Sequence, residues 1–267
     1  MGDYVSGTER VGVRLDATTL HIIFNHPERY NALSVDMWGA LPSMLEQAAT
    51  DDRIRLIVFS GAGEKAFVSG ADISQFEDLR AARDAVAKYE SLAETALTAI
   101  QQCPVPTLAC IRGFCVGGGV NVAVACDLRI ASDDSVFFVP AARLGLGYRH
   151  SAMKTLVELI GPGAAKDLFF TARRVGAAEA LSLGLVNRIA PRDHLDALLN
   201  EYTTALADNA PLTIRAAKFV VSEVSKAPSD FDEAQCRALI RGCFESDDYA
   251  EGRRAFMEKR KPIFKGK

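Results

Sequence analysis

Two short loops carry the residues whose types and spacing could polarise a ligand. The first runs through Ser69, Gly70, Ala71 and Asp72, and the second is the glycine run 117–119. Each follows a buried apolar run, RLIVFSG or TLACIRG, and ligands of open α/β sheets bind at the carboxyl ends of strands. Backbone N–H groups at a helix start attract negative charge, and glycine allows a close approach. A pair of such groups would form an oxyanion hole, although a tight turn explains three glycines equally well.

Several other ligand motifs fail in this sequence. A dinucleotide fingerprint would need glycine where the chain has Val122, and no GK[ST] or GxSxG motif is present. The six cysteines form no CxxC pair and no zinc-type spacing with histidine. The sequence therefore predicts no metal site.

The elements that must hold these loops form an α/β pattern. Apolar alternation predicts a hairpin over VGVRLDA and TTLHIIFN, with its turn at 16–18. Ser34 is the expected N-cap of a helix that ends near Asp51, and a long helix is predicted over 74–102. Further strands are expected at RLIVFSG, TLACIRG, DLRIAS and SVFFVP, and a helix is expected to begin near Ser151.

The pattern changes near residue 192. Residues 1–191 combine strands and helices, whereas 192–267 are helical, with expected helix starts at Asp193 and Pro211. No flexible linker separates the two parts. We therefore expect an α/β core over 1–191 that carries the site. The helical region over 192–267 is expected to pack on the core or on another subunit.

Composition excludes several classes of protein. The 267 residues are 49% hydrophobic and 24% charged, which is too apolar for intrinsic disorder. A net charge of -3 argues against nucleic-acid binding by bulk charge. The sequence has no apolar run long enough for a membrane span, and its polar start has no signal segment. Because most of the cysteines lie in apolar surroundings such as TLACIRGFCV, we expect free thiols and predict a cytoplasmic protein.

Five segments, in order, carry a family resemblance. They are HPERYNALS, KAFVSGADI, GFCVGGGVNVAVACDLRIAS, FTARRVGAAEALSLGLVNRIAP and FMEKRKPIFKG, and the similarity covers nearly the whole chain. The sequence closely resembles the crotonase family, also called the enoyl-CoA hydratase/isomerase superfamily. The resemblance implies an α/β fold, a spiral of repeated β-β-α turns with a C-terminal helical region. It also implies a homotrimer or a dimer of trimers, and an acyl-CoA thioester as substrate.

The resemblance implies roles for particular residues. The backbone N–H groups of Ala71 and Gly118 would hold the thioester oxygen and stabilise an enolate, without a metal or other cofactor. Lys259 and Lys261 would reach coenzyme A phosphates, including those of a neighbouring subunit, unless they form a solvated helix face. The remaining residues expected along the coenzyme A path are Arg29, Ser69, Asp72, Ile73 and Ser74.

The sequence departs from the family's hydratases at both catalytic glutamates. The first position, two residues after the glycine run, is Asn121, and the second, directly after Pro140, is Ala141. An amide can hold a water but cannot accept a proton near pH 7, and alanine can do neither. Each acid–base group contributes roughly 100- to 10,000-fold to rate, so we expect weak hydratase activity. Isomerase chemistry, which needs a base near Ala141, is disfavoured as well.

A third departure lies at 147–151, where family hydratases have a glycine-rich stretch. Tyr148 is expected to face the acyl portion, as in similar decarboxylases of malonyl-type thioesters. Arg149 either faces the pocket or forms an ion pair with an acidic residue. His150 either faces the pocket, caps a helix or is exposed. The sequence therefore predicts an enzyme of the enoyl-CoA hydratase/isomerase type that stabilises a thioester enolate. The alternatives are a decarboxylase of a 2-carboxyacyl-CoA and a non-catalytic acyl-CoA binding protein.

Overall fold

The chain begins with an antiparallel hairpin. The structure, a computed structural model, describes residues 4–72 and 82–267, with the backbone alone over 82–86. Strands β1 (Val11–Asp16) and β2 (Thr19–Phe24) pair along their whole length, and Ala17 in the turn between them has a φ of 49°. The expected hairpin is therefore confirmed.

The hairpin opens a six-stranded sheet of order β1-β2-β3-β5-β7-β10, which is parallel from β2 onward. Its other strands are β3 (Leu56–Gly61), β5 (Thr107–Ile111), β7 (Leu128–Ser132) and β10 (Arg188–Ala190). Successive side chains of a strand point to opposite faces, so Val58 and Phe59 of β3 belong to different core clusters. Both faces of the sheet are therefore buried, as its apolar strands predict.

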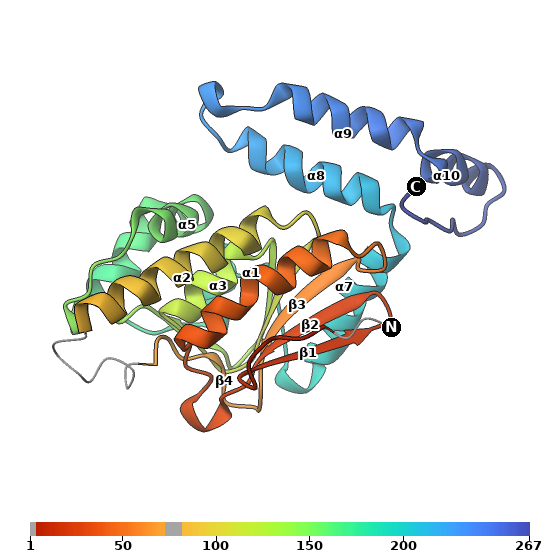
Figure 1. Cartoon of the computed structure of the whole chain (residues 1–267). Coiled ribbons are helices and arrows are strands. Elements are labelled where there is room, and N and C mark those ends of the chain that lie inside the picture. The colour runs from red at the N-terminus through yellow and green to blue at the C-terminus, as the bar shows by residue number, and fades with distance from the viewer. Residues whose placement is uncertain (1–3, 73–81) are drawn as a thin grey trace.

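Helices cover both faces of this sheet (Figure 1). The helices on the face that carries Phe59 include α1 (Val35–Thr50), α2 (Ala82–Gln102) and α3 (Gly118–Ala125). The face that carries Val58 is covered by α7 (Leu195–Asp208). The first long helix after residue 192 thus packs on the core sheet.

A second, four-stranded sheet has the order β4-β6-β8-β9. Its strands are β4 (Ala66–Val68), β6 (Phe114–Val116), β8 (Val136–Phe138) and β9 (Val175–Gly176). The turns β3-β4-α2 and β5-β6-α3 each give one strand to each sheet, which confirms the spiral of repeated β-β-α turns. The sequence does not predict β4 and β6, because each is a three-residue strand beside a glycine turn, whereas β8, which is as short, lies in the longer apolar run SVFFVP.

Parallel pairing of β4, β6 and β8 explains how distant loops come together. β4 pairs with β6, and β6 pairs with β8, in both cases in parallel. The chain leaves these strands through the segments 69–72, 117–119 and 139–141. Because the carboxyl ends of parallel strands meet at one edge, both loops singled out from the sequence lie at the same edge.

The rest of the chain is mostly helical. Before β10 come α4 (Ala141–Leu144), α5 (His150–Thr171) and α6 (Ala177–Ser182), and α5 is broken at Gly161, whose φ is 76°. After α7, an arm over 211–267 extends beyond the core (Figure 1). Its helices are α8 (Pro211–Val224), α9 (Glu233–Glu245) and α10 (Asp247–Met257). In the part of the chain that the structure describes, no helix has the length and apolarity needed to cross a membrane.

Candidate active site

The first loop is held by backbone pairing with the segment before α1. The Leu33 N–H donates to the Gly70 carbonyl at 2.7 Å, and the Asp72 N–H donates to the Leu33 carbonyl at 2.9 Å. These bonds form a parallel bridge between Leu33 and Ala71. The Ala71 N–H takes no part in this bridge, and within 4–72 and 82–267 it donates no backbone hydrogen bond. The pairing therefore fixes the loop and leaves this N–H group available.

The second N–H group belongs to Gly118, the first residue of α3, and it has no acceptor within the helix. The preceding residue, Gly117, has a φ of 51°, a conformation that favours glycine, and its N–H donates to the Phe138 carbonyl at 3.0 Å. A β-carbon added to Gly118 would lie 3.9 Å from the carbonyl carbon of Gly70, the atom bonded to the Ala71 nitrogen. The two predicted donors therefore border one small region.

The third glycine of the run allows this close approach. A β-carbon on Gly119 would stand only 2.5 Å from the Val68 carbonyl oxygen and 2.8 Å from the Val68 β-carbon. Val68 is the last residue of β4, directly before the first loop. Any larger residue at 119 would push α3 away from β4 and separate the two N–H groups.

Tyr148 reaches the same turn from another part of the chain. Its hydroxyl oxygen lies 3.5 Å from the position of a β-carbon on Gly117, and its ring packs edge-on against Phe169 with centroids 4.8 Å apart. Burial raises the pKa of Tyr148 to about 12, so the hydroxyl stays protonated at neutral pH and can donate a hydrogen bond. The structure therefore brings Tyr148 to the glycine turn.

Two further aromatic residues stand near the turn. A β-carbon on Gly118 would lie 3.7 Å from Cζ2 of Trp38, whose ring meets that of Tyr89 edge-on at 6.2 Å. Burial raises the pKa of Tyr89, and the nearby Tyr148 and Asp72 raise it further. Neither Trp38 nor Tyr89 is recognisable from the sequence as a site residue, because helical spacing marks such residues only as core.

The two positions of the missing glutamates lie on the helices that follow β6 and β8. Asn121 is half-buried on the first turns of α3. Ala141 is the buried first residue of α4. Neither position offers a group that exchanges a proton near neutral pH.

The residues expected along the coenzyme A path lie partly at this edge. Arg29 is exposed, and its carbonyl accepts a hydrogen bond from the Ser69 hydroxyl at 3.2 Å. Asp72 is buried at the end of the first loop. The predicted positions Ile73 and Ser74 lie outside the residues that the structure describes.

The residues after Tyr148 differ in environment. Arg149 forms ion pairs with Glu90, at 3.1 Å, and with Glu94, both on α2. The ion-pair alternative for Arg149 is therefore the one observed. His150 is exposed as the first residue of α5.

The two lysines of the C-terminal tail lie far from the glycine turn of their own chain. Figure 1 shows α10 and the C-terminus at one end of the arm, at a distance from β4 and α3. Lys261 pairs with Asp208 at 2.6 Å, and Lys259 is exposed. The structure does not bring these lysines to the loops of the same subunit.

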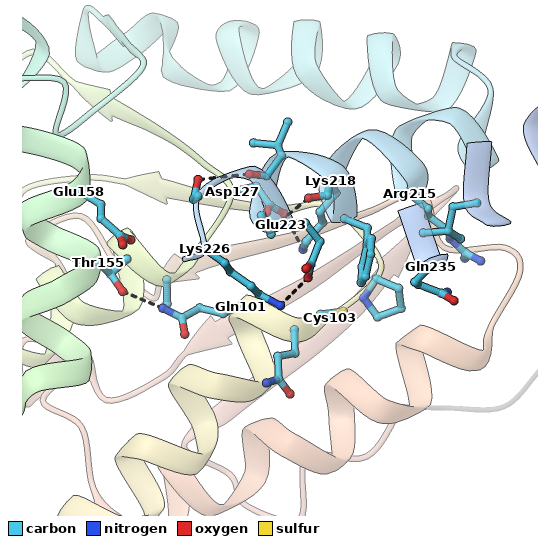
Figure 2. A pocket seen from close by; sticks show the side chains of 18 of the residues that line it. Gln101, Cys103, Asp127, Thr155, Glu158, Arg215, Lys218, Glu223, Lys226 and Gln235 are labelled. Atoms are coloured by element: carbon cyan, nitrogen blue, oxygen red, sulfur yellow. Dashed lines mark hydrogen bonds and ion pairs between the residues drawn. The ribbon is translucent and has the colours of Figure 1, made fainter. Parts of the chain in front are cut away.

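A cleft of about 1080 Å³ lies between the core and the arm (Figure 2). It is lined by the end of α2 and by parts of α5, α8 and α9, and no predicted site residue that the structure describes belongs to its lining. On its wall the Lys218 ammonium donates to Asp127 at 2.7 Å and to the Val105 carbonyl at 3.0 Å. These bonds attach α8 to the core.

The spiral and the paired N–H groups define a class of α/β protein that can hold a carbonyl oxygen as it gains negative charge. The model of the enoyl-CoA hydratase/isomerase family matches residues 14–267, so this chain belongs to that family.

Similar proteins cover nearly the full chain. A short-chain-enoyl-CoA hydratase from Clostridium acetobutylicum is 31% identical, over 90% of this chain and 91% of its own. A peroxisomal Delta(3,5)-Delta(2,4)-dienoyl-CoA isomerase from Arabidopsis thaliana is 30% identical, over 93% of each chain. The crystal structure of an enoyl-CoA hydratase/carnithine racemase from Magnetospirillum magneticum superposes with a TM-score of 0.92, at 32% identity and 97% coverage of both chains.

Proposed function

We propose that this chain binds an acyl-CoA thioester and stabilises the enolate form of that thioester. The supporting observation is the approach of Gly118 to Gly70, which brings the backbone of Gly118 close to that of Ala71. Donors fixed where negative charge develops are worth about 3–4 kcal/mol each in acyl-transfer sites. Coenzyme A enters as part of the substrate, and no other cofactor is proposed.

The replaced glutamates make the reaction differ from ordinary hydration. Hydration needs groups that activate a water and return its proton, and Asn121 and Ala141 supply neither. The Tyr148 hydroxyl beside Gly117 favours a second candidate, decarboxylation of a 2-carboxyacyl-CoA. In that reaction the bond between Cα and the carboxylate breaks and CO₂ leaves. The electron pair passes to the thioester oxygen as an enolate, and a proton from water then returns to Cα.

Parallel assays separate the candidates. Crotonyl-CoA hydration and CO₂ release from malonyl- and methylmalonyl-CoA are measured beside a competent short-chain hydratase. We expect hydration to be at least roughly 1,000-fold below the hydratase, since two acid–base groups are absent. Hydration at the rate of the comparison enzyme would show that another residue supplies the base. Binding of acyl-CoA without turnover of any thioester would support the alternative that the chain is a non-catalytic acyl-CoA binding protein.

We also propose that the arm joins copies of the chain into a homotrimer or a dimer of trimers. It presents Phe244, Phe256 and Met257 to solvent, the last two with 83% and 80% of their surface exposed. Residues of α8, α9 and α10 border a largely apolar groove of about 950 Å³. Exposed apolar surface of this extent is typical of protein–protein contacts.

A further inference from the structure

A small cavity lies one turn along α3 from the glycine run. Its volume is about 20 Å³, about the space that one water molecule needs. Its walls come from α2, α3 and α5, and more than half of its lining residues are polar or charged. Its polar lining residues include Glu94, Asn121 and Ser151.

Two stretches of chain connect this cavity to the oxyanion loops. The Asn121 N–H donates to the Gly117 carbonyl at 3.1 Å, which places Asn121 about 5 Å, one helical turn, further along α3. On the other side, the Tyr148 hydroxyl stands at Gly117, and the next residue, Arg149, pairs with Glu94. An acyl chain that leaves the thioester along α3 would run toward this cavity.

Charged side chains bridge α2 and the start of α5 beside the cavity. Arg149 contacts Glu90 and Glu94, and the Ser151 hydroxyl lies 3.4 Å from a Glu94 oxygen. The side chains of this ion-pair clamp, Glu90–Arg149–Glu94, keep 43–46% of their surface exposed, so water screens both pairs and they contribute little to folding. Covering them with hydrocarbon would remove their water without supplying new partners.

The geometry points to the ion-pair clamp and Asn121 as the determinants of acyl-group choice. The site takes short acyl-CoA thioesters that carry a hydrogen-bonding group near the far end of the acyl chain, and it rejects long hydrocarbon chains. A hydroxyl at that end can occupy the place of one water and bond to Asn121 or Glu94, whereas an alkyl tail would displace water from charges. This inference rests on the proposed function, because it needs the thioester at the loops.

A binding series tests this choice. Calorimetry measures acetyl-, butyryl-, 3-hydroxybutyryl- and octanoyl-CoA against the wild-type protein and against the double variant Glu94→Leu/Arg149→Leu, which removes two of the three charges of the clamp and leaves Glu90. We expect the wild type to bind 3-hydroxybutyryl-CoA at least 10-fold more tightly than octanoyl-CoA. We expect the double variant to reverse or abolish that preference while its affinity for acetyl-CoA stays within about threefold.

The matched control removes another opposite-charge pair of α5. Lys154 and Glu158 stand 3.7 Å apart and border the large cleft of Figure 2 instead of the small cavity. Lys154→Leu/Glu158→Leu is expected to keep the wild-type preference. Equal wild-type affinity for octanoyl- and 3-hydroxybutyryl-CoA, or an unchanged preference in the first double variant, would overturn the inference. Failure of acetyl-CoA itself to bind would instead overturn the proposed function.

Discussion

The hydroxyl oxygen of Tyr148 lies 3.5 Å from the position that a β-carbon on Gly117 would occupy. Gly117 directly precedes the first N–H of α3, so this hydroxyl is a polar side-chain group at the turn that would hold the thioester oxygen. Because Asn121 and Ala141 stand where family hydratases have catalytic glutamates, we expect Tyr148 to act on the acyl portion.

Replacing Tyr148 by phenylalanine removes this hydroxyl and keeps the ring. We expect Tyr148→Phe to leave acyl-CoA affinity nearly unchanged and to lower turnover about 10- to 100-fold, or roughly 1.4–2.7 kcal/mol. The measurement is CO₂ release from malonyl-type thioesters. Tyr202→Phe, on α7 at the opposite face of the sheet, serves as the control. Full activity in Tyr148→Phe would reduce Tyr148 to a packing residue.

The titration of Tyr148 gives a second prediction. Burial raises its pKa from 10 to about 12, so the folded chain keeps this proton when the unfolded chain loses it. The stabilising contribution is complete below pH 10 and is lost as the pH rises toward 12. Tyrosinate absorbance of wild type minus that of Tyr148→Phe should therefore rise near pH 12. A difference spectrum with its midpoint near pH 10 would show that the hydroxyl is solvated.

The glycine run gives a matched pair of variants. In Gly119→Ala the new β-carbon would meet the Val68 backbone at 2.5 Å, whereas nothing lies within 4 Å of a β-carbon on Gly163. We expect Gly119→Ala to lower the free energy of unfolding by roughly 1–3 kcal/mol and to weaken acyl-CoA binding. Gly163→Ala should change stability by less than about 1 kcal/mol and leave binding intact. Chemical denaturation and calorimetry measure both, and equal behaviour of the two variants would refute the packing argument.

Assembly through the arm makes a fourth prediction. Light scattering of the wild type should give the mass of a trimer or hexamer. Phe256→Glu places a charge on a side chain that is 83% exposed in the single chain and should shift the mass toward the monomer. Gln47→Glu adds the same charge on the exposed side of α1 and should not. A wild-type monomer at micromolar concentration would contradict the proposed assembly.

The sequence predicts the hairpin and the buried parallel strands because five or six apolar residues suffice to show a pattern. It does not predict β4 and β6, since their three residues are stabilised by pairing with distant strands. Those two strands bring the loops together, so the sequence identifies the loops while the structure supplies the reason they meet. The sequence does not identify Trp38 and Tyr89 as neighbours of the glycine run, because helical spacing indicates only that they are buried.

The most direct test of the central claim is calorimetric titration with acetyl-CoA and with its thioether analogue, which lacks the carbonyl oxygen. We predict a micromolar dissociation constant for acetyl-CoA, which corresponds to a binding free energy on the order of -8 kcal/mol. We also predict roughly 5- to 100-fold weaker binding of the thioether, because the N–H groups of Ala71 and Gly118 would lose their acceptor. Equal affinity for the two ligands, or no binding of either, would contradict the claim that these groups hold a thioester oxygen.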